Sequence, residues 1–348
     1  MSILKHGPVR FLAMAAVALV AASPSYANIT FNVTYGTSIT GLSNAVAIET
    51  LITNTLAVYT ANFSDPITVS LEFDNMASGL GQSSYVEYTG TSYSSFRTAL
   101  AGDATSANDA TAIANLPNTS TDPVLGNTNI DLKSANGRAI GLSTPAATTN
   151  VNDPGACFVA GTYDGCIGIN FGLTTTGNGT PFPGSYDAQA VLEHEIDEVL
   201  GLGSSLLNVS CGGVACDSTT ISAFANQISP EDLFRYTLAG SRTFVSGQTC
   251  SAITNDAYLS IDGGATQINQ FNQSCNGGDF GDWIQHGTAQ VQDWAATPGA
   301  TPSLSTELIA LDVVGYDSAL PEPATFGLVG GVLLGAAMLR RRLGALSK

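Results

Sequence analysis

The residues of this 348-residue chain best suited to chemistry are His194, Glu195 and Glu198, which form a His-Glu-x-x-Glu pattern. Apolar residues at helical spacing surround them and Gly201 follows, so residues 186–201 are predicted to form a helix. His194 and Glu198 then lie one turn apart on a common face. A histidine nitrogen and a carboxylate oxygen are zinc ligands, and Glu195 is placed to take a proton from metal-activated water. The pattern therefore predicts a metal site beside a catalytic base.

The predicted helix has two different faces. Its apolar stripe contains Ala188, Leu192, Ile196 and Val199, while His194 faces the other way. We expect the stripe to pack in the core and the histidine face to open on a cleft. The alternative is that the acidic residues of this helix form an ordinary solvated face with one exposed histidine.

A catalytic zinc site usually has three protein ligands, so a third must be found. Beyond the first 27 residues the chain has only two histidines, His194 and His286, and a site of three histidines cannot form within one chain. His286 is our candidate for the third ligand. The alternative is a carboxylate, for which the candidates are Asp232, Asp279 and Asp282.

Both ends of the chain have the composition of export and sorting segments. Residues 1–27 combine a basic start, a short apolar run and small residues before position 28, which is typical of a secretory signal peptide. An N-terminal membrane anchor is the alternative, but the run is short for a span. Residues 321–348 begin with Pro-Glu-Pro, continue with an apolar stretch and reach three consecutive arginines. We therefore expect the fold to occupy residues 28–320.

The charge of this central region limits its partners. Six of the 11 basic residues but only one of the 28 acidic residues lie in the two end segments, which leaves about −22 for the rest. Such a surface repels nucleic acid and anionic lipid, so neither is an expected partner. It suits an extracellular protein and a structural Ca²⁺ ion, although plain solubility accounts for most of the carboxylates.

The cysteines also indicate an exported protein. An even number of cysteines in a secreted chain predicts disulfides, and six allow 15 pairings. Pairing of sequence neighbours is our hypothesis, and the spacings do not match a structural zinc site. The expected pairs are Cys157 with Cys166, Cys211 with Cys216, and Cys250 with Cys275.

The remaining patterns predict a mixed α/β (α+β) fold. Residues 29–35, 66–73 and 166–171 read as strands, and residues 42–62 and 305–314 read as helices. Between the motif helix and the last helix, the sequence predicts a lobe rich in loops. We see no internal repeat.

The ordered features of the C-terminal segment resemble the PEP-CTERM sorting tail of Gram-negative bacteria. The resemblance implies export across the inner membrane, with the tail as a transient anchor that sorting machinery cuts near Pro-Glu-Pro. It also implies that the mature protein is secreted or held at the cell surface, with the exopolysaccharide matrix as a further partner.

The motif helix resembles that of zincin proteases, since Glu198 replaces the last histidine of His-Glu-x-x-His and Leu-Gly follows. Together with four downstream segments, it resembles PEP-CTERM-sorted, metzincin-related secreted metalloproteases. These segments are residues 232–236, 260–264, 278–283 and 308–316. The resemblance implies a zincin-like fold over residues 28–320, with a twisted mixed sheet, long helices and a loop-rich, disulfide-tied C-terminal lobe. The two lobes would flank the 186–201 helix.

The implied function is that of a zinc-dependent endopeptidase acting on protein or peptide substrates. His194 and Glu198 would bind zinc, with His286 as third ligand, and Glu195 would be catalytic. The sequence departs from the metzincin pattern, because Ser204 occupies the place of the third histidine and no methionine lies between Gly201 and Gly315. The alternatives are an inactive zincin-fold matrix or adhesion protein and a calcium-stabilised surface protein without chemistry.

Overall fold

The structure is a computed structural model, which describes residues 28–148, 159, 161–175, 181, 183–206, 228–244, 257–272, 278–285 and 287–319. The predicted signal peptide, the predicted sorting tail and His286 lie outside these residues. Cys166 is disulfide-bonded. The other five cysteines are outside the described part of the chain, so the pairings remain predictions. Among the described helices, none has the length and apolar character needed to cross a membrane.

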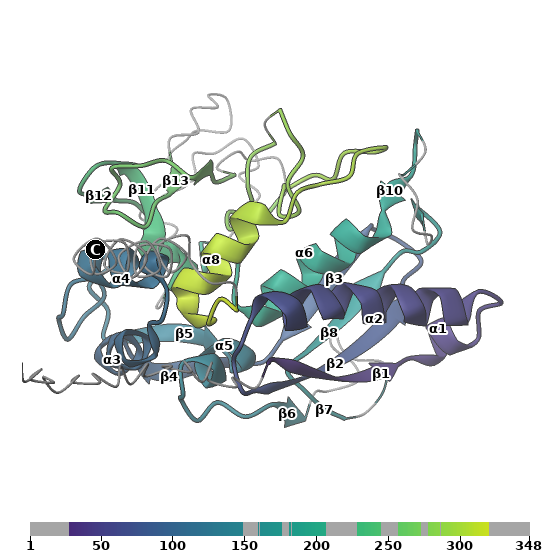
Figure 1. The fold of residues 1–348 in the computed structure, drawn as a ribbon, viewed down its shortest axis with the longest axis horizontal. Coiled ribbons are helices and arrows are strands. Elements are labelled where there is room, and N and C mark those ends of the chain that lie inside the picture. Colours follow the sequence, from purple (N-terminus) through teal and green to yellow (C-terminus); the bar gives the residue numbers. More distant parts are fainter. Residues whose placement is uncertain are drawn as a thin grey trace, which may run out of the picture.

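The central element is a four-stranded mixed sheet in the order β1-β2-β8-β3 (Figure 1). Strands β1 (Thr30–Tyr35), β2 (Thr68–Asn75) and β8 (Gly165–Ile169) are parallel. Strand β3 (Gly81–Tyr85) pairs antiparallel with β8, with Gly81 opposite Ile169. This arrangement places β3 at one edge of the sheet.

Two long helices pack on this sheet, and a third packs against the second of them. α2 (Ala45–Asn62) and α6 (Ala188–Leu200) lie side by side over one face, and α8 (Ser305–Gly315) lies beside the end of α6 (Figure 1). The Tyr59 hydroxyl of α2 lies 3.0 Å from the Glu193 carbonyl and 2.7 Å from Asp197 Oδ1, both on α6. These contacts fix the position of α6 on the sheet.

The other elements lie outside the central sheet. In the first half of the chain they are α1 (Thr37–Thr40), β4 (Glu87–Ser92), α3 (Tyr93–Asp103), α4 (Ala107–Asn115), β5 (Asn129–Lys133), α5 (Ser134–Ala139), β6 (Ala147–Thr148) and β7 (Thr162–Tyr163). After β8 they are β9 (Thr174–Thr175), β10 (Tyr186–Asp187), the 3-10 helix η1 (Pro230–Phe234), β11 (Arg235–Leu238), β12 (Ser241–Arg242), β13 (Tyr258–Leu259) and β14 (Asn269–Gln270). The predicted mixed α+β class is confirmed, and the described residues after η1 contain only short strands before α8.

Candidate metal centre

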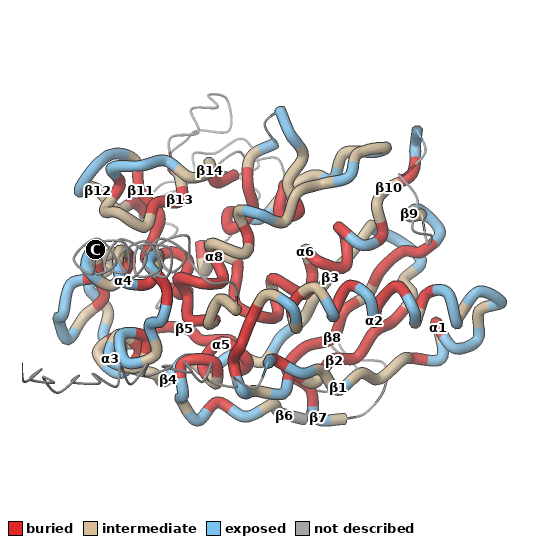
Figure 2. The backbone as a smooth tube through the Cα atoms, viewed as in Figure 1, coloured by how far each residue is buried: buried red, intermediate tan, exposed pale blue. Residues whose placement is uncertain are grey.

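The predicted motif helix forms as α6, and its two ends have clear physical causes. Asp187 is the N-cap, since its Oδ1 accepts hydrogen bonds from the amides of Gln189 and Ala190 at 3.0 and 3.4 Å. At the other end Gly201 adopts a φ of 151°, and its amide donates to the Asp197 carbonyl at 2.9 Å. Most of the helix is buried (Figure 2). The helix is therefore a rigid support for its side chains.

The last turn of α6 is held by a buried lysine. Lys133, at the end of β5, donates from Nζ to the carbonyl oxygens of Glu198 and Leu202. Its ammonium also lies 3.7 Å from the centre of the Tyr85 ring. A cation at this end also compensates the negative end of the helix dipole. Lys133 thus fixes the backbone that carries Glu198.

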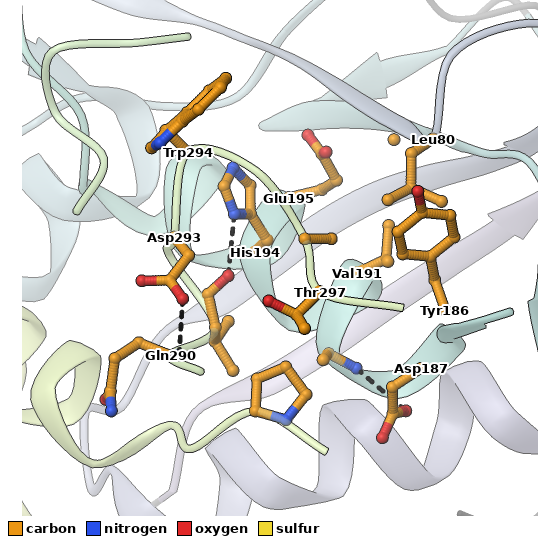
Figure 3. Close-up of a pocket in the computed structure, with 15 residues that line it drawn as sticks. Leu80, Tyr186, Asp187, Val191, His194, Glu195, Gln290, Asp293, Trp294 and Thr297 are labelled. Carbon is orange, nitrogen blue, oxygen red and sulfur yellow. Dashed lines mark hydrogen bonds between the residues drawn. The ribbon is translucent and has the colours of Figure 1, made fainter. Parts of the chain in front are cut away.

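Three side chains converge at the predicted metal site. His194 Nε2 lies 3.8 Å from Glu198 Oε1 and 3.8 Å from Asp282 Oδ1, and the three ligand atoms lie within 4.8 Å of one another. His194 Nδ1 lies 3.0 Å from the Val291 carbonyl oxygen (Figure 3). A carbonyl oxygen only accepts, so Nδ1 carries the proton. In the neutral ring, Nε2 then presents its lone pair to the two carboxylates.

Glu195 lies next to this cluster, against the edge strand. A Cβ atom added to Gly81 would lie 2.3 Å from Glu195 Oε1, so glycine at this position leaves room for the end of the Glu195 side chain where it now lies. Glu198 is held from the same strand, since its Oε2 accepts a hydrogen bond from the Ser83 hydroxyl. Strand β3 therefore shapes the positions of both glutamates.

A cavity of about 160 Å³ opens beside His194 and Glu195 (Figure 3). Its walls come from the start of β3, from β10 and α6, and from the segment 290–302. Apolar side chains form much of the wall, namely Leu80, Tyr186, Ala190, Val191, Val291, Trp294, Ala296 and Pro302. The cavity thus adjoins both the cluster and the predicted base.

Negative charge dominates the electrostatics of the cluster. Burial and the charge of Glu198 raise the pKa of Glu195 well above its ordinary value. Burial and Glu198 also raise the pKa of Asp282 and of Asp279. For His194, burial lowers the pKa, but Glu195 and Glu198 outweigh it and the pKa is raised. A cation at the centre would relieve this repulsion.

The structure places the alternative carboxylate ligands differently. Asp282 is the one that reaches His194, whereas Asp232 is bound by the Ser204 hydroxyl and by the amides of Ser205 and Ser229 at 3.0 Å. Asp232 therefore organises the loop after α6. Ser204 stands where the metzincin pattern would have its third histidine, and here its hydroxyl donates one of the hydrogen bonds to Asp232.

The alternative that the acidic residues of the motif helix form a solvated face is wrong for Glu193, Glu195 and Asp197. Glu193 is 5% exposed, Glu195 6% and Asp197 0%. Their side chains are packed against the elements around α6. Tyr59 of α2, for example, donates its hydroxyl hydrogen bond to Asp197. The stripe of apolar residues is buried, as predicted.

A second acidic group lies far from the motif in sequence. Carboxylate oxygens of Asp65, Asp103 and Asp317 lie within 4.8 Å of one another. Both oxygens of Asp65 accept from the Asp317 amide, at 3.3 and 3.1 Å. Exposed and half-buried acidic groups are common without an ion, so a structural Ca²⁺ remains a prediction.

The donor set of the cluster is compatible with a divalent metal. One imidazole nitrogen and two carboxylate oxygens suit zinc, and the Nδ1 contact to Val291 is the outer contact that metal-bound histidines typically make. Asp282 is among the alternative ligands expected from the sequence, whereas the contacts of Val291, Gly81 and Ser83 were not expected. No local signal marks the last two, because strand β3 lies about 100 residues before α6 in the sequence.

Comparisons of the chain with protein-family models, with curated proteins and with solved structures found no match.

Proposed function

We propose that this protein is a zinc-dependent endopeptidase of zincin-like architecture. The observation that supports it best is the convergence of His194, Glu198 and Asp282, with the base candidate Glu195 beside them. Zinc would be held by His194 Nε2 and by the carboxylates of Glu198 and Asp282. When bound, it would supply a Lewis acid that polarises the peptide carbonyl and makes water acidic enough to react near neutral pH.

The chain's own residues would perform the proton transfers. Glu195 is buried beside the cluster, and its raised pKa suits a carboxylate that accepts a proton from water and returns it to the leaving amine. The raised pKa falls when a cation neutralises the charge of Glu198, so the loaded site would keep Glu195 ionised and ready to accept.

The edge strand provides a place for the substrate. Among the described strands, β3 pairs only with β8, so its other edge has no strand partner. An extended peptide can add to such an edge through backbone hydrogen bonds. A peptide on β3 would pass Gly81, next to Glu195, and could place one side chain in the adjoining cavity. This arrangement favours peptides over small-molecule substrates.

Metal content and proteolysis test the proposal together. The full chain should contain close to one zinc ion, and His194→Ala should lose it. Casein cleavage should vanish in Glu195→Gln while zinc stays bound. Absence of zinc at neutral pH from the wild-type chain would overturn the proposal, and unchanged cleavage by Glu195→Gln would remove Glu195 from the mechanism.

A second candidate is a zincin-like protein without peptidase activity that serves in the matrix or in adhesion. The donor set favours it, because two carboxylates and one imidazole are also suited to harder metals such as Mn²⁺ or Ca²⁺. Two negative ligands also weaken the electrostatic effect of the metal on water. Stoichiometric metal without any cleavage, in wild type and Glu195→Gln alike, would support this candidate.

A further inference from the structure

One loop supplies two of the contacts that define the His194 imidazole. Asp282 faces Nε2 and the Val291 carbonyl accepts from Nδ1, so the ring lies between the two ends of segment 282–291. The described part of this segment has no helix or strand beyond isolated bridges, such as Trp283 with Asp293. Something other than regular secondary structure must therefore hold its ends.

The Trp283 amide donates to the Gln292 carbonyl at 2.8 Å, and Glu307 adds two side-chain contacts at the same place. Glu307 Oε1 accepts one hydrogen bond from Trp283 Nε1 and another from the Gln292 amide, both at 2.9 Å. Trp283 directly follows Asp282, and Gln292 directly follows Val291. A single oxygen thus ties together the two residues next to the two contacts of His194.

The support for Glu307 is itself firmly placed. Glu307 lies in the first turn of α8 and is fully buried. The α8 backbone is tied to α5 by Asn136 Nδ2, which donates to the Val314 carbonyl at 2.8 Å. Beyond α8, the Tyr316 hydroxyl donates to the Leu200 carbonyl of α6 at 2.6 Å. The helix that carries Glu307 is therefore tied to the helix that carries His194.

We propose that Glu307 is a positioning residue for the metal centre, which holds Asp282 and the Val291 carbonyl on opposite sides of His194. The metal-related part of this inference rests on the proposed function. The orientation of the ring does not, because the Nδ1 contact exists without an ion. Outer contacts of this kind typically change metal affinity ~10–100-fold.

Two substitutions of Glu307 separate positioning from charge and from folding. Glu307→Gln keeps a carbonyl oxygen that can accept both hydrogen bonds, while Glu307→Leu keeps the size and removes the acceptor. Asp109→Asn is the matched control, since Asp109 is a buried acidic residue in the first turn of α4. Trp283→Phe removes one donor and retains a buried ring, and it replaces Glu307→Leu if that variant does not fold.

The first measurement is the tautomer of His194 in the metal-free chain, by nitrogen NMR at a pH where the ring is neutral. Wild type, Glu307→Gln and Asp109→Asn should show the proton on Nδ1, and Glu307→Leu or Trp283→Phe should show a mixture. An unchanged tautomer in the folded variant overturns the inference, whatever zinc does. If Glu307→Gln loses the Nδ1-protonated tautomer as far as Glu307→Leu does, the inference is also overturned, because the charge of Glu307 and not its hydrogen-bond acceptor would then matter.

The second measurement is zinc affinity by competition with a chelator. Glu307→Leu should bind ~10–100-fold more weakly than wild type, with Glu307→Gln and Asp109→Asn close to wild type. Equal affinity of Glu307→Leu and wild type overturns the metal-related part. If the wild-type chain binds no zinc, the proposed function fails and so does that part, while the tautomer still decides whether Glu307 orients the ring.

Discussion

The ammonium group of Lys133 donates to the backbone carbonyl of Glu198, the residue whose carboxylate faces His194. A buried cation on β5 therefore holds the part of α6 that carries a candidate metal ligand. The same ammonium binds the Leu202 carbonyl just after the helix. The candidate metal centre and the stability of the helix end are thus linked through one side chain.

Lys133→Met should weaken both the fold and metal binding. The two buried carbonyl oxygens would lose their donor, which costs about 1–3 kcal/mol in the free energy of unfolding. Zinc affinity should fall about tenfold, because Glu198 is no longer fixed. Arg97→Met is a matched control, since Arg97 similarly binds the Leu116 and Ile113 carbonyl oxygens at the end of α4. It should destabilise the chain in denaturant unfolding without changing zinc affinity. Equal affinity losses in the two variants would contradict this link.

Asp282 and Asp279 lie in one loop and should differ in their effect on the metal. Asp282 lies 3.8 Å from His194 Nε2, whereas Asp279 affects the cluster only through its charge. Asp282→Asn should reduce zinc affinity by more than the ~10–100-fold typical of outer contacts. Asp279→Asn should change it less than tenfold. Chelator competition measures both, and a larger loss in Asp279→Asn would exchange their roles.

The sequence predicted the pair on the helix because helical spacing alone brings His194 and Glu198 together. The third ligand was open, since no local pattern tells which loop of the segment after α6 folds back over that helix. Asp282 reaches the site through tertiary contacts that include Glu307, about 25 residues further along the chain. Local periodicity carries no information about such contacts.

The fold shows the same contrast between elements set by local sequence and elements set by tertiary contacts. The long elements α2, β2 and α6 follow from their apolar periodicity, and the structure confirms them. Strand β3 was missed because its sequence, Gly-Gln-Ser-Ser-Tyr, is polar and has no β-branched residue. It becomes a strand by pairing with β8 at the edge of the sheet. Tertiary pairing, and not intrinsic preference, decided this element, which borders the candidate site.

The stability of the chain should fall as the pH rises, because of its buried carboxyl groups. Burial, with the charges of Asp317 and Asp103, raises the pKa of Asp65 to about 8, and burial with Asp317 raises that of Asp103 to about 7. Their pKa in the unfolded chain is about 3.9. Between these values the folded state binds more protons, so unfolding releases protons and higher pH favours it.

Thermal unfolding in EDTA from pH 5 to pH 8 tests this expectation. The Tm of the wild-type chain should fall over that interval. Asp103→Asn removes one titrating carboxyl group and one repulsive charge, so the Tm of this variant should fall less over the same interval. Glu49→Gln changes the net charge equally on α2, and its Tm should follow the wild-type slope. Parallel slopes for wild type and Asp103→Asn would show that this acidic group does not control the pH dependence.

Gly81→Ala should impair proteolysis without removing zinc. The added methyl group would lie 2.3 Å from Glu195 Oε1 and 2.9 Å from Val191 Cγ1, so the end of the Glu195 side chain must move. A displacement of about 1 Å in a catalytic group can cost ~10²-fold in rate, and we expect a loss of this size in casein cleavage. Gly90→Ala is the matched control, because an added Cβ there would meet nothing within 4 Å. Zinc content and Tm should stay close to wild type in both variants. Cleavage by Gly81→Ala at the wild-type rate would mean that Glu195 does not act from its position against β3.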